Sequence, residues 1–192
     1  MKFSVRAVLI IVLSLLMLSM STAKNETFIM GPYMVSFDLN LTQEYNAKNE
    51  TKHLETYSGI KYDAYIIELN SDGNFALISI AYYNDTMNKS IEDMRPNGED
   101  FLRSLNNYNI KTHNRTIDNQ PGVLSIGANS NGDCMFAAQY WASLTKYGAT
   151  SILIKSNYPW DNGTLSLLKT IHVRLICNTT EGIPKIESNK QR

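Results

Sequence analysis

Three histidines, His53, His113 and His172, are the first residues to consider for metal binding or general-base chemistry. Each stands alone, without the close His or Cys neighbours of a zinc site, so a metal centre would need three distant segments to converge. We expect His172 to be a packed or capping histidine beside the last predicted helix. The sequence predicts no metal site and no cofactor.

The sequence also lacks a motif for nucleophilic catalysis. Ser125 precedes Ile126-Gly127 but has no glycine before it, as a Gly-x-Ser-x-Gly elbow requires. A Cys-His enzyme could use Cys134, although an exported cysteine more often forms a disulfide. No catalytic residue is therefore predicted, and capping explains the carboxylates at a predicted helix start, Glu92, Asp93, Glu99 and Asp100.

Two loops have a faint calcium-site character. One holds Asn129, Asn131 and Asp133 around a glycine, and the other holds Asp72 and Asn74 around Gly73. The first loop has its glycine in the wrong position and no bidentate glutamate at the required distance. Turn formation explains these residues equally well, so we expect turns.

Aromatic residues are the remaining source of binding chemistry. Trp141 follows Tyr140, and Trp160 follows Tyr158-Pro159. If its side chain is exposed, either tryptophan could stack on a sugar or anchor a protein partner. We expect both to pack in the core, because large aromatic side chains are highly buried on average, and we keep binding as the alternative.

The N-terminus has the pattern of an export signal. Lys2 and Arg6 precede an apolar run, Ala7 to Met20, and small residues at Ser21 to Ala23 suit a signal peptidase. The run of about fourteen residues is shorter than the ~20 of a membrane-spanning helix. We expect cleavage before Lys24 and a secreted or cell-surface protein with no membrane span; an uncleaved anchor is the alternative.

Eight Asn-x-Ser/Thr sequons agree with export. Random placement of the chain's Asn, Ser and Thr residues gives about three, so the motif is enriched, although accidental sequons in an Asn-rich chain are the alternative. We expect glycosylation among Asn25, Asn40, Asn49, Asn84, Asn88, Asn114, Asn162 and Asn178.

The chain has two cysteines, Cys134 and Cys177. Outside the cell an even pair usually closes, and a loop of about 44 residues would add roughly 4 kcal/mol of stability. We expect this disulfide, with two separate buried thiols as the alternative. Basic and acidic residues balance at 18 each, which gives no basic surface for nucleic acid.

The remaining chain suits one domain. We expect a signal peptide at residues 1–23, a single domain at 24–180 and a polar flexible tail at 181–192. Alternation predicts a strand over Tyr33–Leu39, and Asp72-Gly73 between apolar runs predicts a hairpin. Further strands are expected in the ranges Lys52–Tyr57, Ile110–Ile117, Val123–Ala128, Cys134–Ser143 and Thr150–Ser156.

Two helices are expected. Asn97 can cap the first, after a turn over Ser90–Met94 that Pro96 interrupts. The second begins near Asp161 or Thr164 and places leucines and Ile171 on one face as far as Leu175. The expected class is α+β, a mostly antiparallel sheet with about two covering helices, and a pure β-sandwich is the alternative.

Two segments carry a resemblance. Gly31 to Leu39, and Ser156 to Trp160 with the leucine-rich stretch after it, resemble small secreted archaeal proteins of unknown function, and the element order is similar to the PsbP-like α/β/α sandwich. The resemblance implies a non-catalytic accessory or binding role. We expect an exported glycoprotein that binds a protein or glycan at the cell exterior; the alternative is an extracellular hydrolase with a site dispersed in sequence.

Overall fold

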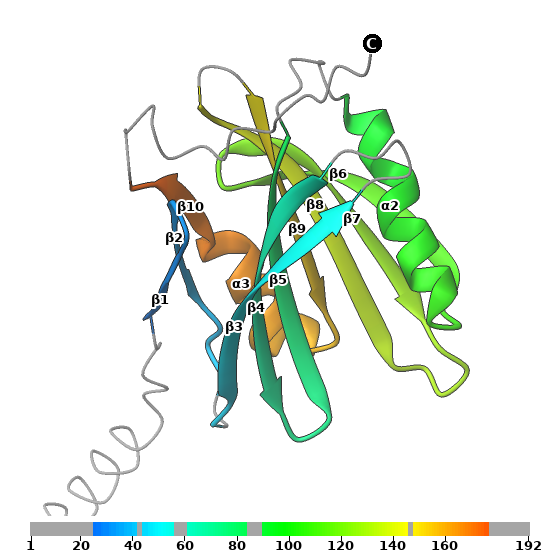
Figure 1. Cartoon of the computed structure of the whole chain (residues 1–192). Helices are drawn as coiled ribbons and strands as arrows, with labels where there is room; N and C mark the ends of the chain where they lie inside the picture. The colour runs from blue at the N-terminus through cyan, green and yellow to red at the C-terminus, as the bar shows by residue number, and fades with distance from the viewer. Residues whose placement is uncertain (1–24, 42–43, 56–60, 84–89, 146–147, 177–192) are drawn as a thin grey trace, which may run out of the picture.

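In the described part of the chain, ten antiparallel strands form two sheets that pack face to face (Figure 1). The computed structural model describes residues 25–41, 44–55, 61–83, 90–145 and 148–176. The smaller sheet has the order β1-β2-β10, and the larger has the order β3-β4-β5-β9-β8-β7-β6. Their bounds are β1 Asn25–Met30, β2 Tyr33–Asp38, β3 Asn46–Glu55, β4 Lys61–Ser71, β5 Asn74–Tyr83, β6 Tyr108–Ile117, β7 Gln120–Ala128, β8 Cys134–Thr145, β9 Gly148–Ser156 and β10 His172–Leu175.

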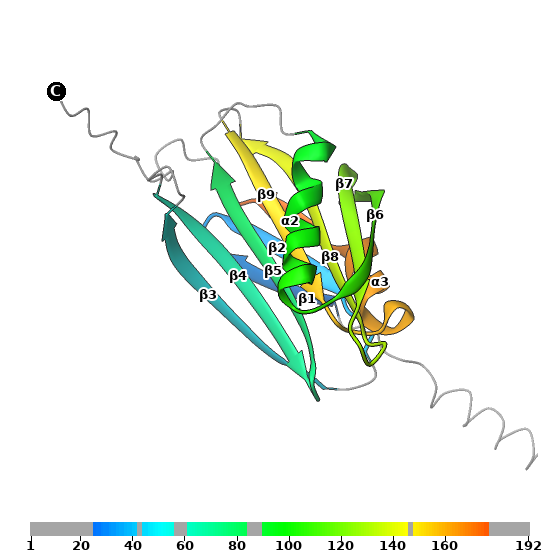
Figure 2. The same ribbon diagram turned by 90° about the vertical axis from the view of Figure 1, so that its right-hand side faces the viewer.

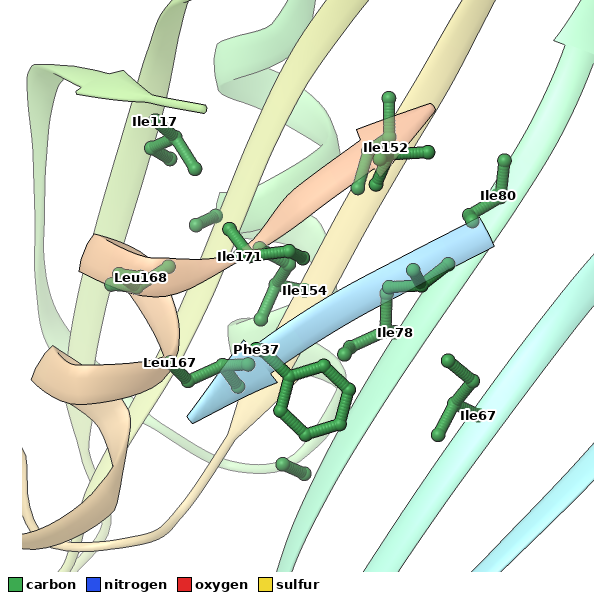
Figure 3. Close-up of a cluster of buried hydrophobic side chains, with 14 of the residues drawn as sticks. Phe37, Ile67, Ile78, Ile80, Ile117, Ile152, Ile154, Leu167, Leu168 and Ile171 are labelled. Carbon is green, nitrogen blue, oxygen red and sulfur yellow. The ribbon is translucent and has the colours of Figure 1, made fainter. Parts of the chain in front are cut away.

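The core lies between the two sheets (Figure 3). Alternate residues of each strand point to one face, so Ile67, Ile78 and Ile154 meet Phe37 and the two buried leucines of α3, Leu167 and Leu168. These side chains are at most 2% exposed. The short helix α3 (Leu165–Thr170) follows an irregular turn, η1 (Trp160–Thr164), and closes this side of the sandwich.

The residues in two of the turns determine where the chain reverses to form hairpins. Asp72 and Gly73 both have positive φ, 39° and 82°, as a two-residue turn between twisted strands requires. Asp118 and Asn119 form the same kind of turn between β6 and β7, with φ of 50° and 58°. The predicted Asp72-Gly73 hairpin is confirmed, and β4 pairs with β5 directly across it.

The expected α+β class, with the PsbP-like sandwich, is wrong. Within the described residues the fold is β-rich, with 63% strand and 19% helix, and its two helices are short. Among the described elements, α2 (Ile91–Ser104) is the one helix on the outer face of the large sheet, and the inner face is covered by a second sheet instead of a second long helix. The architecture is therefore nearer to the sandwich kept as the alternative.

Three local expectations fail for identifiable reasons. The first helix begins at Ile91 with Ser90 as its cap and continues through Pro96, so Asn97 does not cap it. The predicted last helix ends at Thr170, and its second half becomes β10 because Val173 and its neighbours pair with β2. Strand β1 was not predicted; it pairs with β2 across the turn at Gly31.

Candidate binding face

Helix α2 approaches the large sheet closely at Gly98, which has no side chain. Its start is fixed by a capping box, in which Asp93 N–H donates to Ser90 Oγ (3.2 Å) and Ser90 N–H donates to the Asp93 carboxylate (2.8 Å). Met94, Gly98 and Leu102 are buried on one helix face. A Cβ on Gly98 would lie 2.8 Å from Ser125 Oγ, so only glycine fits at this distance.

A polar network lies under α2. Asn97 Nδ2 donates to Gln139 Oε1 (3.0 Å), and Gln139 Nε2 donates to Ser151 Oγ (3.0 Å). Thr112 Oγ1 donates to Glu99 Oε1 (2.8 Å) and also lies 2.9 Å from Ser125 Oγ. These bonds satisfy polar side chains that the helix buries, and they fix its position over β6, β7 and β8.

The outer face of β4 and β5, and the part of β9 that α2 does not cross, lie beside α2 with no described helix or strand over them (Figure 2). We name this surface the open half-face and define it by Phe75, Leu77, Ser79, Leu153 and Lys155, all partly exposed. The alternation that buries Ile78 in the core turns Leu77 outward. The open half-face therefore presents apolar side chains on a broad, ordered sheet.

One cation stands at the junction of α2 and the open half-face. Lys155 Nζ lies 3.8 Å from the centre of the Phe101 ring, a cation–π contact. Burial lowers the pKa of Lys155. The register places Glu68, Leu77 and Lys155 in one row across three strands, so charges border the apolar side chains.

Edge strand β3 adds a charged rim. Its residues Lys48, Glu50 and Lys52 alternate along the strand on the side of the open half-face. Glu50 lies 2.8 Å from Lys52 Nζ and 3.7 Å from Lys48 Nζ. The hydrogen bond from Lys52 lowers the pKa of the Glu50 carboxyl. All three are solvent-accessible, so this rim contributes specificity more than stability.

The two tryptophans lie on opposite faces of the large sheet. Trp160 packs against Phe136, with ring centres 5.4 Å apart, and the Arg115 guanidinium lies 5.2 Å over its ring. It borders the core. Trp141 lies on the α2 side of β8, paired with Ser151 of β9 and so at the boundary of the open half-face. Both are partly buried, and only Trp141 is placed to meet a ligand on that surface.

The histidines are well separated in the structure. His53 is exposed on β3, with Nδ1 2.6 Å from Asp63 Oδ1, and His113 is exposed on β6. His172 lies on β10 instead of beside a helix, with Nδ1 2.7 Å from Asp118 Oδ1. Among the described residues no three His, Cys, Asp or Glu side chains could hold a metal ion.

Asp118 forms a cluster that the sequence did not predict. Its carboxylate also accepts hydrogen bonds from Val173 N–H (2.9 Å) and from the buried Tyr140 hydroxyl (3.2 Å). Burial, together with the Asp118 charge, raises the pKa of Tyr140, so this hydroxyl remains a donor. The positive-φ turn was a readable signal, but no pattern reveals a partner about 55 residues away.

The same cluster contains a His–Asp pair, which in a Ser-His-Asp triad orients the base beside a nucleophile. The register places Ser36 of β2 opposite His172. Asp118, however, accepts the Val173 N–H, which points away from β2 because consecutive strand residues alternate in direction. Asp118 thus holds the His172 ring at the free edge of β10 and satisfies the outward Val173 N–H there.

The two glycine loops behave as turns. Asn129 Oδ1 accepts from Asn131 N–H and Asp133 N–H, both at 2.9 Å, which is the geometry of an Asx turn. The loop at Gly73 borders a shallow polar depression of about 340 Å³. Its lining comes from the β4–β5 turn and the start of β3: Glu44, Asn46, Asn70, Ser71, Asp72, Gly73, Asn74 and Phe75.

The predicted modification sites fall partly within the described residues. The sequon asparagines Asn25, Asn40, Asn49, Asn114 and Asn162 are all exposed, whereas Asn84, Asn88 and Asn178 lie outside the described residues. Cys134 is exposed at the start of β8. Its predicted partner Cys177 also lies outside them, so the disulfide stays a prediction, as does the signal at residues 1–23.

Comparison with known proteins adds no identity. No protein-family model, no curated protein and no solved structure matches the chain. The resemblance to secreted archaeal proteins therefore stays a prediction. In the described part of the chain, no helix is long and apolar enough to cross a lipid bilayer.

The open half-face itself had a sequence signal. Phe75 to Ala81 is almost continuously apolar, with Ser79 as the exception, while an outward-polar strand would alternate. Such runs are typical of strands that are apolar on both faces. What the sequence could not show is which part of that outer face α2 leaves uncovered.

Proposed function

We propose that this protein is an exported glycoprotein that binds another protein through the open half-face, without catalysis. The observation that carries the proposal is the part of the outer face of β5 and β9 that no described helix or strand covers, where Phe75, Leu77 and Leu153 remain partly exposed beside α2. Apolar side chains bordered by charges are the usual composition of a protein–protein interface.

The shape of this surface favours a protein over a small ligand. Small-molecule sites are concave, with a few polar groups converging on one point. The open half-face is a sheet surface, and its charges, Lys155, Glu68 and the β3 rim, lie along its borders. The expected partner presents an apolar surface with both signs of charge at its margin.

The sequon positions agree with this assignment. Asn49 faces the opposite side of β3 from Glu50, and Asn114 lies on β6, beyond α2. Glycans at these two sequons would therefore leave the open half-face accessible. Export itself rests on the N-terminal signal and on the enrichment of sequons.

Affinity capture with matched variants tests the binding role. The mature glycosylated protein is used to capture proteins from the surface fraction of its own cells, in parallel with L77Q/L153Q and with I29Q. Ile29 is 62% exposed on the small sheet and serves as the control. We expect one partner retained by the wild type and I29Q and lost by L77Q/L153Q. Equal retention by all three proteins would overturn the proposal.

Export is tested separately by sequencing the N-terminus of the protein recovered from its native cells. We expect Lys24 as the first residue in the surface or external fraction. A protein found only in the cytoplasm and beginning at Met1 would contradict export, whatever it binds.

A further inference from the structure

Four strands form the edges of the two sheets: β1 and β10 in the small sheet, β3 and β6 in the large one. An edge strand has unpaired backbone N–H and C=O groups, which can pair with a strand of another molecule. Natural proteins block such edges with charges, bulges or a covering group. Each edge of this protein therefore needs a device that prevents self-association.

Three of these edges carry a complete, exposed sequon. Asn25 and Thr27 lie on β1, Asn49 and Thr51 lie on β3, and Asn114 and Thr116 lie on β6, and all six side chains are exposed. None of the six inner strands contains a sequon. A sequon on a strand places its Asn and Thr on the same face, because the strand period is two.

The fourth edge is partly satisfied by the protein itself. Asp118 accepts the outward Val173 N–H of β10 at 2.9 Å and holds His172 at the same edge. The edge without a sequon in its strand is thus the one where a carboxylate accepts the outward Val173 N–H. Edge strand β3 carries the charged side chains Lys48, Glu50 and Lys52 as well as its sequon. The restriction of strand sequons to edge strands gives their placement a physical reason beyond an Asn-rich composition.

The sequons outside the strands differ from these three. Asn162 is exposed in η1, but its Thr164 is 1% exposed and donates to the Tyr158 carbonyl at 2.7 Å. Packing therefore explains why a threonine occupies that position. Asn114, in contrast, accepts a hydrogen bond from Arg95 Nη2 through Oδ1 (2.6 Å), which leaves the amide nitrogen for the sugar.

We propose that Asn25, Asn49 and Asn114 carry N-linked glycans that block β1, β3 and β6 against pairing with other chains. The chemistry is a group transfer from a lipid-phosphate-linked glycan. Asparagine Nδ2 forms a bond to the anomeric carbon, the bond from that carbon to the phosphate oxygen breaks, the amide loses one proton and the lipid phosphate leaves. The bulky, hydrated product keeps a second strand from the edge. This inference rests on the proposed export.

Glycopeptide mass spectrometry of the protein from its native cells tests occupancy. We expect glycan at all three edge asparagines. Unmodified asparagine at these positions, in a protein that begins at Lys24, would overturn this inference and leave export intact. A cytoplasmic protein beginning at Met1 would instead overturn export, on which the inference rests.

Analytical ultracentrifugation of variants tests the edge role. N25Q/N49Q/N114Q removes the glycans, T27S/T51S/T116S keeps the sequons as a matched control, and N40Q/N162Q removes two sequons that lie outside the strands. We expect only N25Q/N49Q/N114Q to shift from monomer to larger species. A fully monomeric N25Q/N49Q/N114Q protein would overturn the edge role.

Deglycosylation of the folded wild-type protein covers the case in which N25Q/N49Q/N114Q fails to fold. The circular dichroism spectrum should stay unchanged while the sedimentation coefficient rises. A deglycosylated protein that keeps both its spectrum and its sedimentation coefficient would contradict edge blocking.

Discussion

The two faces of the seven-stranded sheet differ in how completely their side chains are buried. On the inner face, Ile67, Ile78 and Ile154 are at most 2% exposed beneath the small sheet and α3. On the outer face, α2 covers three strands over a hydrogen-bonded polar layer, and the neighbouring Leu77 and Leu153 stay partly exposed. The inner face therefore supplies stability, while the outer face keeps apolar surface that we propose for binding.

Two adjacent residues of β5, Ile78 and Leu77, should differ most in how much their substitution lowers the free energy of unfolding. Ile78→Ala removes a fully buried side chain from the core and should lower the free energy of unfolding by about 3 to 4 kcal/mol. Leu77→Ala, one residue away on the outer face, should cost about 1 kcal/mol or less, since less of its area leaves water on folding. Urea unfolding measures both, and equal losses would contradict the division between faces.

The Asp118 cluster seals the inner face at the edge of β10. Asp118→Ala leaves the Val173 N–H and the buried Tyr140 hydroxyl without their acceptor, so we expect a loss of about 2 to 3 kcal/mol by urea unfolding. Asp63→Ala removes the exposed partner of His53 and should cost less than about 0.5 kcal/mol. Amide exchange at Val173 should accelerate only in the first variant.

Close packing of α2 predicts an inverted glycine effect. Alanine is normally better than glycine inside a helix by about 1 kcal/mol. Gly98→Ala should instead destabilise by about 1 to 2 kcal/mol, because its Cβ would lie 2.8 Å from Ser125 Oγ. The double variant G98A/S125G should recover much of the loss in thermal unfolding. A stabilised G98A protein would show that α2 lies farther from the sheet.

Substitution of Lys155 should have the smallest effect on stability, but it should change how the free energy of unfolding depends on pH. Its pKa is lowered by burial from the ordinary 10.5, so in alkaline solution the unfolded chain binds more protons than the folded one. The free energy of unfolding should therefore rise with pH as it approaches 10.5. Lys155→Met should remove this rise with little change in stability at neutral pH. A slope unchanged in the variant would contradict the assignment.

Local chemistry made part of the fold predictable. Asp72-Gly73 specifies its hairpin within a few residues, and the alternation over Tyr33–Leu39 marks β2 correctly. The segment after Thr170 was misassigned because Ile171 and Leu175 continue a helical spacing, while pairing with β2 determines its conformation. Tertiary pairing overrides local pattern there.

The candidate site was less predictable than the fold. Residue type was enough to name Trp141 and the sequons as candidates, but their placement depends on strand order, which brings β9 between β5 and β8. Asp118 and Val173 meet across two sheets, so no local window contains their bond. The extent of the open half-face likewise depends on where α2 lies, and that position is set by contacts at Gly98 and Ser125.

Oxidative footprinting tests the central claim most directly. Hydroxyl radicals label exposed side chains on the protein as it occurs at its native cell surface and, separately, after purification. We predict that oxidation of Phe75 and Leu77 falls in the native setting, while oxidation of Met34 on the outer face of the small sheet is unchanged. Equal oxidation of Phe75 and Leu77 in both settings, or protection at Met34 alone, would contradict binding through the open half-face.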